Sequence, residues 1–408
     1  MAGALPTEST NTNRRLDRTL LVLYAATVVG IVVHQGLTHV DTNFAIFRAS
    51  FRHLATGQDL YAAYAGEQVD RFKYSPVFAL LFAPFALPPT LIALAAWNAL
   101  NVFLLVYAMR RLLPDGAATL ALLLIYLEVV RTTERAQSNA VVAALIILAF
   151  VYVEERRQLS AAAVIATGAF VKIFPAAALT FAIFHRRRLR TAVAVLVTGA
   201  AGLALPLLVT SPAALAAQYA SWFRLESSDA TASAMGGGAG LYGGVMYQLR
   251  QWLGVTWPNW AVQLAGTALL LAPLGRVRCW TDPRFRVRFL CSLLVFVVIF
   301  NHQVESPSFV IAVAGIAIWF VTSERTKLDV ALMALTILVV SLSSTELMPH
   351  AWQRDFFVRY RLKTIPCLLV WLVMQAELLG LRRSAPLGQR AEVGKADVAT
   401  PQALANGS

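Results

Sequence analysis

Residues 41–76 read DTNFAIFRASFRHLATGQDLYAAYAGEQVDRFKYSP and decide how the rest of the chain is interpreted. The segment carries eight charged side chains and lies between an apolar run at 19–36 and another that starts at residue 77. Within it, apolar residues recur at intervals of three and four: Phe44, Phe47, Phe51 and Leu54. This spacing places them on one helical face and predicts an amphipathic helix lying along a membrane interface.

Residues within and beside this predicted helix carry further signals. Arg48 and Arg52, four residues apart, share a second face that is suited to a lipid phosphate. Gly57 is placed where a helix C-cap is expected. Asp41 precedes the helix and has two readings: an N-cap, or a general base that accepts a proton from an attacking hydroxyl. The two roles are compatible.

The composition is typical of polytopic helical membrane proteins. Of 408 residues, 58% are hydrophobic and 14% are charged, and the mean hydropathy is +0.62. Many apolar runs approach the roughly 20 residues that a bilayer crossing requires. The net charge of +13 does not indicate nucleic-acid binding, because basic residues form short clusters between apolar runs. We expect an all-α protein with about 11–13 membrane segments.

The expected organisation is a cytoplasmic tail (1–18), a transmembrane domain (19–381) and a disordered cytoplasmic tail (382–408). The run at 19–36 follows three arginines and is long enough for a signal anchor. The other candidate runs lie at 77–87, 91–109, 117–130, 140–153, 161–184, 191–209, 260–274, 289–300, 309–321, 328–342 and 365–379. None of the three cysteines has metal-ligand spacing, so we expect no metal and no cofactor.

Basic clusters predict the topology. Those at 185–190, 276–288, 324–327 and 382–383 are expected in the cytoplasm, and the loops at 38–76, 211–258, 301–308 and 344–363 outside. Simple alternation conflicts with the positive-inside rule between 76 and 184. The conflict is removed if Pro88 and Pro89 interrupt a single crossing, and if 161–184, broken at Pro175, is a re-entrant hairpin with both ends cytoplasmic.

Two groups of cations are candidates for binding a phosphate. Lys172 lies inside an apolar run, where a charge costs at least about 2.5–3.5 kcal/mol, so it needs an anionic partner or must snorkel to the interface. Three more precede the last run and face outward in this topology: Arg359, Arg361 and Lys363. The alternative for these three is a solvated loop end.

Other polar residues also have a functional and an ordinary reading. His302 and Glu305 lie three apart, where a histidine can relay a proton or hydrogen-bond a phosphate or sugar, but they equally fit a polar turn between spans. Gln137 and Asn139 are sugar-type hydrogen bonders or ordinary helix-start residues. The glycines and aromatic residues of 211–258 fit a mobile lid or an interfacial belt.

Five motifs together resemble glycosyltransferase family 87, whose members are integral-membrane GT-C enzymes. They are D-x-x-F at 41–44, G-x-x-x-Y at 57–61, F-x-Y-x-P at 72–76, Q-x-N at 137–139 and K-x-F-P at 172–175. The family includes polyprenol-phosphate-mannose-dependent α-mannosyltransferases of phosphatidylinositol mannoside synthesis. Tyr61, Lys73 and Tyr74 lie in these motifs and are further candidates for substrate binding.

The resemblance implies inverting transfer of a hexose, here mannose, from a polyprenyl phosphate to a glycolipid or glycan acceptor on the extracytoplasmic side of the inner membrane. Asp41 takes the place of the catalytic aspartate and His302 that of a histidine in a late external loop. A glycolipid transporter or flippase is the rival, although such proteins place polar groups at the midplane between inverted repeats, which are not evident here. A noncatalytic assembly partner is a third reading.

Overall fold

The computed structural model describes residues 8–38, 43–64, 66, 70–234 and 243–382. Across these ranges the chain forms helices joined by turns, without a β-strand. The predicted all-α membrane class is confirmed. Asp41, the glycine-rich centre of the loop at 235–242 and the tail at 383–408 lie outside the described residues, so the predictions made for them stay predictions.

Within the described part of the chain, five helical segments are long and apolar enough to cross a bilayer. They are α1 (Glu8–Thr38), α5 (Thr90–Leu112), α6 (Asp115–Glu134), α9 (Arg188–Ala204) with η2 (Leu205–Leu208), and α15 (Lys327–Thr336) with η6 (Ile337–Ser341) and η7 (Leu342–Ser344). Shorter helices lie among them: α7 (Asn139–Glu154), α8 (Gln158–Val171), η1 (Phe174–Phe184), α12 (Asn259–Leu271) with η3 (Ala272–Gly275), η4 (Val277–Cys279), α13 (Pro283–Ile299), η5 (Ser306–Ser308) with α14 (Phe309–Val321), and α17 (Thr364–Leu378).

The centre of the bundle is built from α7, α13 and α14. The side chains of α7 and α14 are buried nearly all round, as expected for helices that are apolar on every face, and α13 is mostly buried from Phe289 onward. Gly315 allows α13 and α14 to pack closely, because a Cβ there would lie 2.7 Å from the Cys291 carbonyl oxygen.

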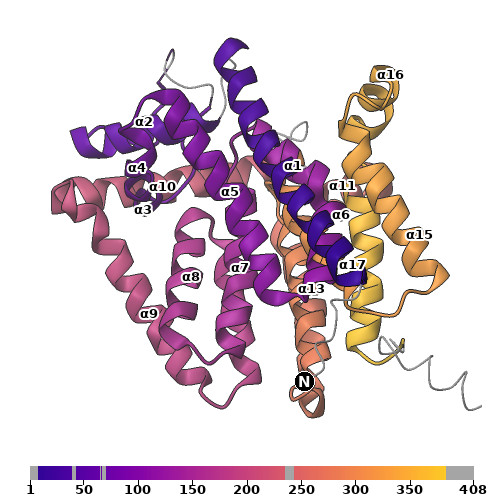
Figure 1. Cartoon of the computed structure of the whole chain (residues 1–408). Coiled ribbons are helices and arrows are strands. Elements are labelled where there is room, and N and C mark those ends of the chain that lie inside the picture. The colour runs from indigo at the N-terminus through magenta and orange to yellow at the C-terminus, as the bar shows by residue number, and fades with distance from the viewer. Residues whose placement is uncertain (1–7, 39–42, 65, 67–69, 235–242, 383–408) are drawn as a thin grey trace, which may run out of the picture.

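A layer of helices covers one end of this bundle (Figure 1). It contains α2 (Asn43–Thr56), α3 (Pro76–Leu81), α4 (Ala83–Ala86) and α10 (Pro212–Ala234), and at the same end lie α11 (Val245–Leu253), α16 (His350–Trp352) and η8 (Gln353–Val358). We call this the capped end.

The amphipathic helix predicted from residues 44–54 is α2. Its apolar face packs on protein, and Phe47 is fully buried at the centre of an aromatic cluster. The Phe47 ring centroid lies 4.9–5.9 Å from those of Tyr74, Phe78, Phe82 and Trp97. Gly57 ends the helix with φ +75°, a left-handed conformation that glycine adopts without strain, so the predicted C-cap is confirmed.

The run at 77–87 is not part of a membrane crossing. It forms α3 and α4, which are both too short to span a bilayer, and Pro84 lies at the start of the second. The crossing predicted for this region is made by α5 alone. The reason is the aromatic cluster, because Phe78 and Phe82 are buried against α2 rather than facing lipid.

The hairpin predicted at 161–184 is present. Chain direction reverses between α8 and η1, and Glu154 and His185, which flank the pair, are in contact at 3.0 Å. The two arms touch closely, since a Cβ on Gly168 would lie 2.9 Å from the Pro175 Cβ. Both ends of the hairpin therefore lie on one side of the bundle. Their location in the cytoplasm remains a prediction.

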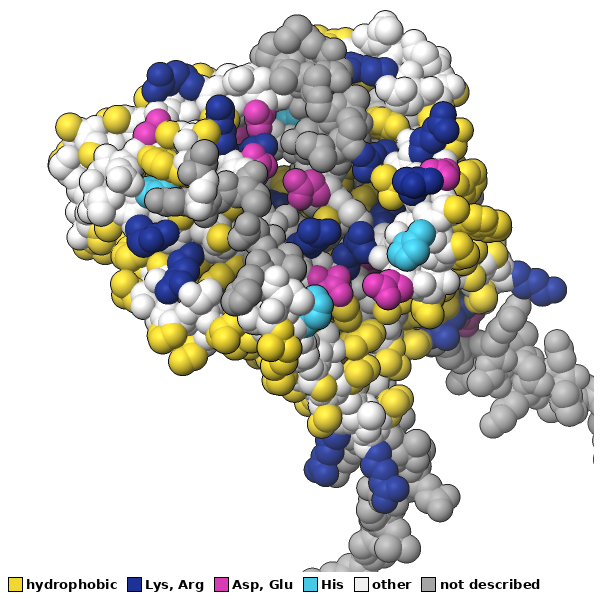
Figure 2. Space-filling model, turned by 90° about the horizontal axis from the view of Figure 1, so that it is seen from above, with side chains coloured by type: hydrophobic (Ala, Val, Ile, Leu, Met, Phe, Trp, Pro, Cys, Tyr) yellow, Lys and Arg dark blue, Asp and Glu magenta, His cyan; other side chains and the backbone are white. Residues whose placement is uncertain are grey.

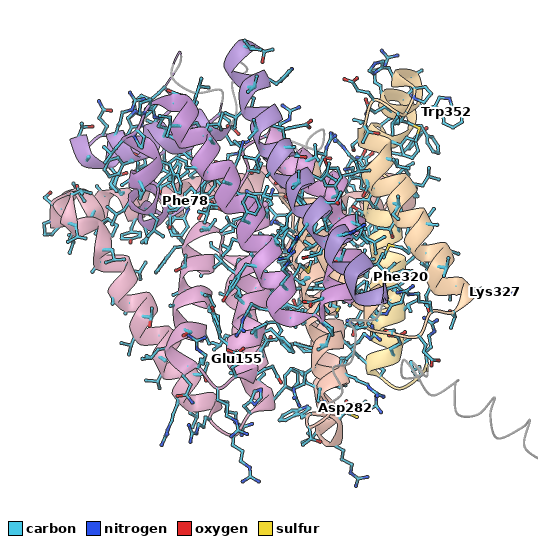
Figure 3. All side chains as sticks on the ribbon, viewed as in Figure 1. Phe78, Glu155, Asp282, Phe320, Lys327 and Trp352 are labelled. Atoms are coloured by element: carbon cyan, nitrogen blue, oxygen red, sulfur yellow. The ribbon has the colours of Figure 1, made fainter. Side chains whose placement is uncertain are left out.

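The end opposite the capped end holds paired charges. Salt bridges there join Arg110 to Asp17, Arg111 to Glu155, Arg286 to Glu154, Arg288 to Glu377, and Arg382 to Asp329. Figure 3 labels Glu155 and Asp282 at this end, opposite Phe78 and Trp352. The basic clusters thus gather on one side of the bundle, as the positive-inside rule requires; we call it the basic end.

Candidate active site

A cavity of about 580 Å³ opens at the capped end, and we call it the first cavity. Its walls come from α2, the segment before α3, the turn between α8 and η1, α10, α12, α13 and the loop after α13. Six of the residues predicted from sequence line it: Lys73, Tyr74, Gln137, Lys172, His302 and Glu305. Figure 2, which looks onto this end, shows basic, acidic and histidine side chains gathering near the middle of the face.

Lys172 lies at the tip of the α8–η1 hairpin. The residue is extended (φ −147°, ψ 143°) and ends α8, because Pro175 begins the next helix. Its Nζ donates a hydrogen bond to the Asn139 Oδ1 at 2.7 Å and lies 6.0 Å from the Tyr74 ring centroid. Burial lowers the pKa of Lys172 to about 8, and the carboxylate of Glu305 opposes this shift. No ion-pair partner for Lys172 is present among the described residues.

The segment before α3 carries Lys73 and Tyr74 along the cavity wall. Ser75 fixes it by capping α3, accepting a hydrogen bond from the Phe78 amide and donating one to the Phe170 carbonyl. The Tyr61 hydroxyl donates to the Tyr74 carbonyl at 2.9 Å, so Tyr61 supports the wall from outside the cavity. Lys73 forms an ion pair with Asp229 at 3.3 Å.

Gln137 is positioned by a strained turn. Ala136 has φ +48°, a left-handed conformation that costs a residue other than glycine of order 1–3 kcal/mol, and its carbonyl accepts a hydrogen bond from the Trp97 indole. Gln137 donates from its Nε2 to the Glu305 Oε2 at 3.2 Å. Such strain at a cavity wall indicates that the position of Gln137 matters more than local stability.

His302 follows α13 in a polar turn. Its Nδ1 lies 3.4 Å from the Gln263 Nε2, and its Nε2 is buried with no hydrogen-bond partner among the described residues. Burial lowers the pKa of His302, and Asp229 opposes the shift, so the imidazole is neutral at pH 7. A buried ring nitrogen without a partner is one that a bound ligand can satisfy.

Three residues on α10 were missed from the sequence. Trp222 and Glu226 line the cavity, and Asp229 pairs with Lys73. Burial raises the pKa of Glu226, and the nearby Asp229 raises it further. The signal was readable, because spacings of four and three place these residues on one face of a helix. Asn43, at the start of α2, also lines the cavity, two positions after Asp41 in the chain.

The remaining wall of the first cavity is apolar. It is formed by side chains from the hairpin and from the end of α13: Ile173, Phe174, Ala177, Phe296, Val297 and Phe300. Cations on one side and hydrocarbon on the other suit an amphiphile with an anionic head. Among the described residues, no three His, Cys, Asp or Glu side chains form a group that could hold a metal ion.

A second cavity of about 430 Å³ lies beside the first and shares Glu305 with it. Arg131, Arg361 and Lys363 line this cavity rather than the first. Lys363 pairs with the buried Glu128 at 3.4 Å. Burial lowers the pKa of Lys363, while Glu128 opposes the shift. The predicted cationic group at 359–363 is therefore separated from Lys172.

Besides Tyr61, four predicted residues lie outside both cavities. Arg48 donates hydrogen bonds to the carbonyls of Ala86 and Pro88, at 3.1 and 2.6 Å, and so fastens α2 to the turn before α5. Arg52 is exposed on α2. Asn139 is buried behind Lys172. Arg359 is exposed, and its carbonyl accepts a hydrogen bond from the Tyr247 hydroxyl.

Fold and site together define a helical membrane protein with an amphiphile-sized cavity at one end of its bundle, lined by charged side chains on one side and apolar ones on the other. The model of glycosyltransferase family 87 matches residues 72–300, more than half of the chain. The chain belongs to this family, which is of the GT-C type, and the expected membrane glycosyltransferase class is confirmed.

Among solved structures, the chain is similar to ArnT from Cupriavidus metallidurans in two states. With the crystal structure bound to undecaprenyl phosphate it shares 15% identity and a TM-score of 0.39, and with the apo crystal structure 15% identity and a TM-score of 0.40. Each alignment covers 88% of this chain and 73% of ArnT. No curated protein matches the sequence.

Proposed function

We propose that the protein transfers a hexose, by family resemblance mannose, from a polyprenyl phosphate to an acceptor hydroxyl on the extracytoplasmic side of the cell membrane. The observation that carries the proposal is the first cavity, where Lys172 has no carboxylate partner among the described residues and faces an apolar wall. The donor phosphate would bind at Lys172, and the prenyl chain would lie along Phe296 and Phe300.

The first task of the site is to stabilise the leaving group. Cleavage of the bond between the anomeric carbon and the phosphate oxygen leaves its electron pair on the phosphate, whose negative charge increases. Lys172, half-buried and hydrogen-bonded to the neutral amide of Asn139, would stabilise this charge. The unpartnered Nε2 of His302 is a hydrogen-bond site for the phosphate or a sugar hydroxyl.

The second task is to activate the acceptor. Its hydroxyl oxygen attacks the anomeric carbon on the face opposite the leaving phosphate, and the hydroxyl proton passes to a carboxylate. We assign this role to Asp41. Two observations support the assignment: Asp41 matches the D-x-x-F motif, and Asn43, two residues later, lines the cavity. A single displacement of this kind inverts the anomeric configuration.

The position of the polar side chains favours a transferase over a flippase. A transporter usually binds its substrate near the bilayer midplane between inverted repeats. Here Lys73, Lys172 and His302 line the first cavity, and none of them takes part in the ion pairs of the basic end. Protein-dependent movement of intact donor across vesicles, without cleavage, would favour the flippase.

The direct experiment is a transfer assay with Asp41→Asn. Purified protein is incubated with a polyprenyl-phosphate hexose and membrane glycolipids, and the released polyprenyl phosphate is measured. Loss of the general base should lower the rate by about 10²–10⁴-fold without weakening binding of undecaprenyl phosphate. Asp115→Asn, at an exposed position at the start of α6, is the matched control. Full activity of Asp41→Asn would remove Asp41 from the mechanism.

A further inference from the structure

The second cavity has no role in the proposed binding of the donor. It touches the first cavity at Glu305, whose carboxylate lines both, and Gln137 holds the Glu305 Oε2 at 3.2 Å from the side of the first cavity. Its volume of about 430 Å³ falls within the roughly 300–1,000 Å³ of small-molecule sites. A molecule bound there would meet the donor at this carboxylate.

The charge of the second cavity does not favour a phosphate. Lys363 is already paired with Glu128, whose side chain is fully buried behind it. Glu305 and Glu346 also line the cavity and balance the guanidinium groups of Arg131 and Arg361. Asp70, Glu226 and Glu305 line the first cavity as well, but Lys172 there forms no ion pair among the described residues, whereas in the second cavity Lys363 is already paired with a carboxylate.

The lining instead matches a carbohydrate. Hydroxyl and amide groups that both donate and accept hydrogen bonds alternate with aromatic rings: Ser306, Ser343, Ser344, Gln353, Phe309 and Phe357. Sugars present hydroxyls that donate and accept, together with apolar C–H faces that pack on aromatic rings. Neutral polar groups with two rings are therefore more suited to a sugar than to an ion.

These walls are fixed before any ligand binds. Arg131 donates hydrogen bonds to the Ser306 hydroxyl at 3.1 Å and to the Ser344 carbonyl, so it joins two sides of the cavity. Arg361 is held in a left-handed conformation (φ +51°), and its carbonyl accepts a hydrogen bond from the Gln248 Nε2 at 2.7 Å. A strained residue at a cavity wall is expected where positioning serves a ligand.

We propose that the second cavity binds the sugar head group of the acceptor, and that Glu305 is a positioning residue that accepts a hydrogen bond from an acceptor hydroxyl beside the donor. The proposal rests on the proposed transferase function. Proton removal stays with Asp41, and Glu305 orients the nucleophile. The acceptor is thus a glycoside or glycolipid recognised through neutral hydroxyls.

The test measures acceptor kinetics with the purified full-length protein. A polyprenyl-phosphate hexose is the donor, and octyl α- and β-hexosides are the acceptor probes. Glu305→Gln keeps the shape of the side chain but weakens the acceptor hydrogen bond, so acceptor KM should rise by about tenfold. Binding of undecaprenyl phosphate should stay within about twofold. Ser344→Phe, which fills the second cavity, should raise acceptor KM and spare that binding too.

Controls separate positioning from damage to the fold. Asp355→Asn removes an exposed carboxylate at the same end, outside both cavities, and should leave acceptor KM unchanged. Glu305→Asp should recover part of the loss, which a structural defect would not allow. If Ser344→Phe fails to fold, His350→Ala, at an exposed position on the wall, replaces it and should also raise acceptor KM.

Three results would overturn the proposal. The first is an unchanged acceptor KM in Glu305→Gln and in the cavity variants, with the wild-type protein active. The second is an effect on undecaprenyl phosphate binding alone, which would assign Glu305 to the donor. The third is wild-type transfer to membrane glycolipids but to no octyl hexoside, which would contradict recognition through a sugar head group. No cleavage of donor under any condition would instead contradict the transferase function itself.

Discussion

Arg288 at the basic end and Lys172 at the first cavity are two cations with different kinds of partner. At the basic end, Arg288 and Glu377 lie 2.8 Å apart and both are nearly buried, and Glu377 also accepts a hydrogen bond from the Trp319 indole at 3.1 Å. At the capped end, Lys172 is half-buried on the wall of the first cavity and donates to the neutral amide of Asn139. The buried pair is satisfied within the protein, whereas Lys172 has no ion-pair partner among the described residues that an added anion would have to displace. Breaking the first pattern is expected to destabilise the fold, and the second pattern makes Lys172 a candidate binding residue.

The largest effect on stability should come from the paired charges. Arg288→Met would leave Glu377 buried with only Arg382, at 3.4 Å, as an ionic partner. Breaking a buried pair in this way costs about 3–5 kcal/mol. Thermal unfolding in detergent should show a clearly lower Tm, and the protein that remains folded at low temperature should keep its donor affinity. An unchanged Tm would show that the basic end does not depend on this pair.

Lys172→Gln should lower the transfer rate without lowering stability, which is the opposite of the result expected for Arg288→Met. The amide can still bond to Asn139 but carries no charge for the leaving phosphate, so the transfer rate should fall by about 10²–10³-fold. Stability should stay equal or rise, because a buried charge is removed. Lys327→Gln, at an exposed position at the start of α15, is the matched control. Equal losses in the two variants would contradict a specific role for Lys172.

The pH dependence of donor binding gives a finer test. The pKa of Lys172 is lowered to about 8, so the empty site holds its cation below that pH and loses it above. A phosphate monoester has its second pKa near ~6 and does not titrate further in this range. Undecaprenyl phosphate should bind progressively more weakly from pH 8 to 10, by up to about tenfold per unit. Lys172→Gln should remove this dependence; the same slope in both proteins would assign it to another group.

Arg48→Met should have the smallest effect of these variants. It tests whether Arg48 stabilises the fold or binds the donor phosphate. The sequence predicted Arg48 as a phosphate ligand, whereas the structure shows it bonded to carbonyls at the turn before α5. We expect a loss of about 1–3 kcal/mol in unfolding free energy and donor affinity within about twofold of wild type. Weaker binding of undecaprenyl phosphate at unchanged stability would restore the role predicted from sequence.

Sequence patterns correctly predicted the features that depend on residues close together in the chain. Helical spacing predicted α2, Gly57 predicted its end, and Pro175 in a long apolar run predicted the hairpin that carries Lys172 at its tip. The cost of a charge in hydrocarbon also identified Lys172 as a residue that needs a partner.

Sequence could not predict which distant residues meet. Lys172 and Lys363 looked alike as cations near apolar runs, but only the fold places Glu128 beside Lys363 and an amide beside Lys172. No partner for Arg48 could be read from the sequence either, because its hydrogen-bond acceptor lies in the turn before α5, which only the fold brings next to α2. Lys363 and Glu128 are 235 residues apart in the chain, and a local sequence pattern cannot relate residues at such a separation.

An experimental structure of the full-length protein with undecaprenyl phosphate bound would test the central claim most directly. We expect the phosphate within hydrogen-bonding distance of the Lys172 Nζ, the prenyl chain along Phe296 and Phe300, and the second cavity free for an acceptor. A phosphate bound instead at Arg361 and Lys363, with Lys172 still on Asn139 and no lipid in the first cavity, would contradict it.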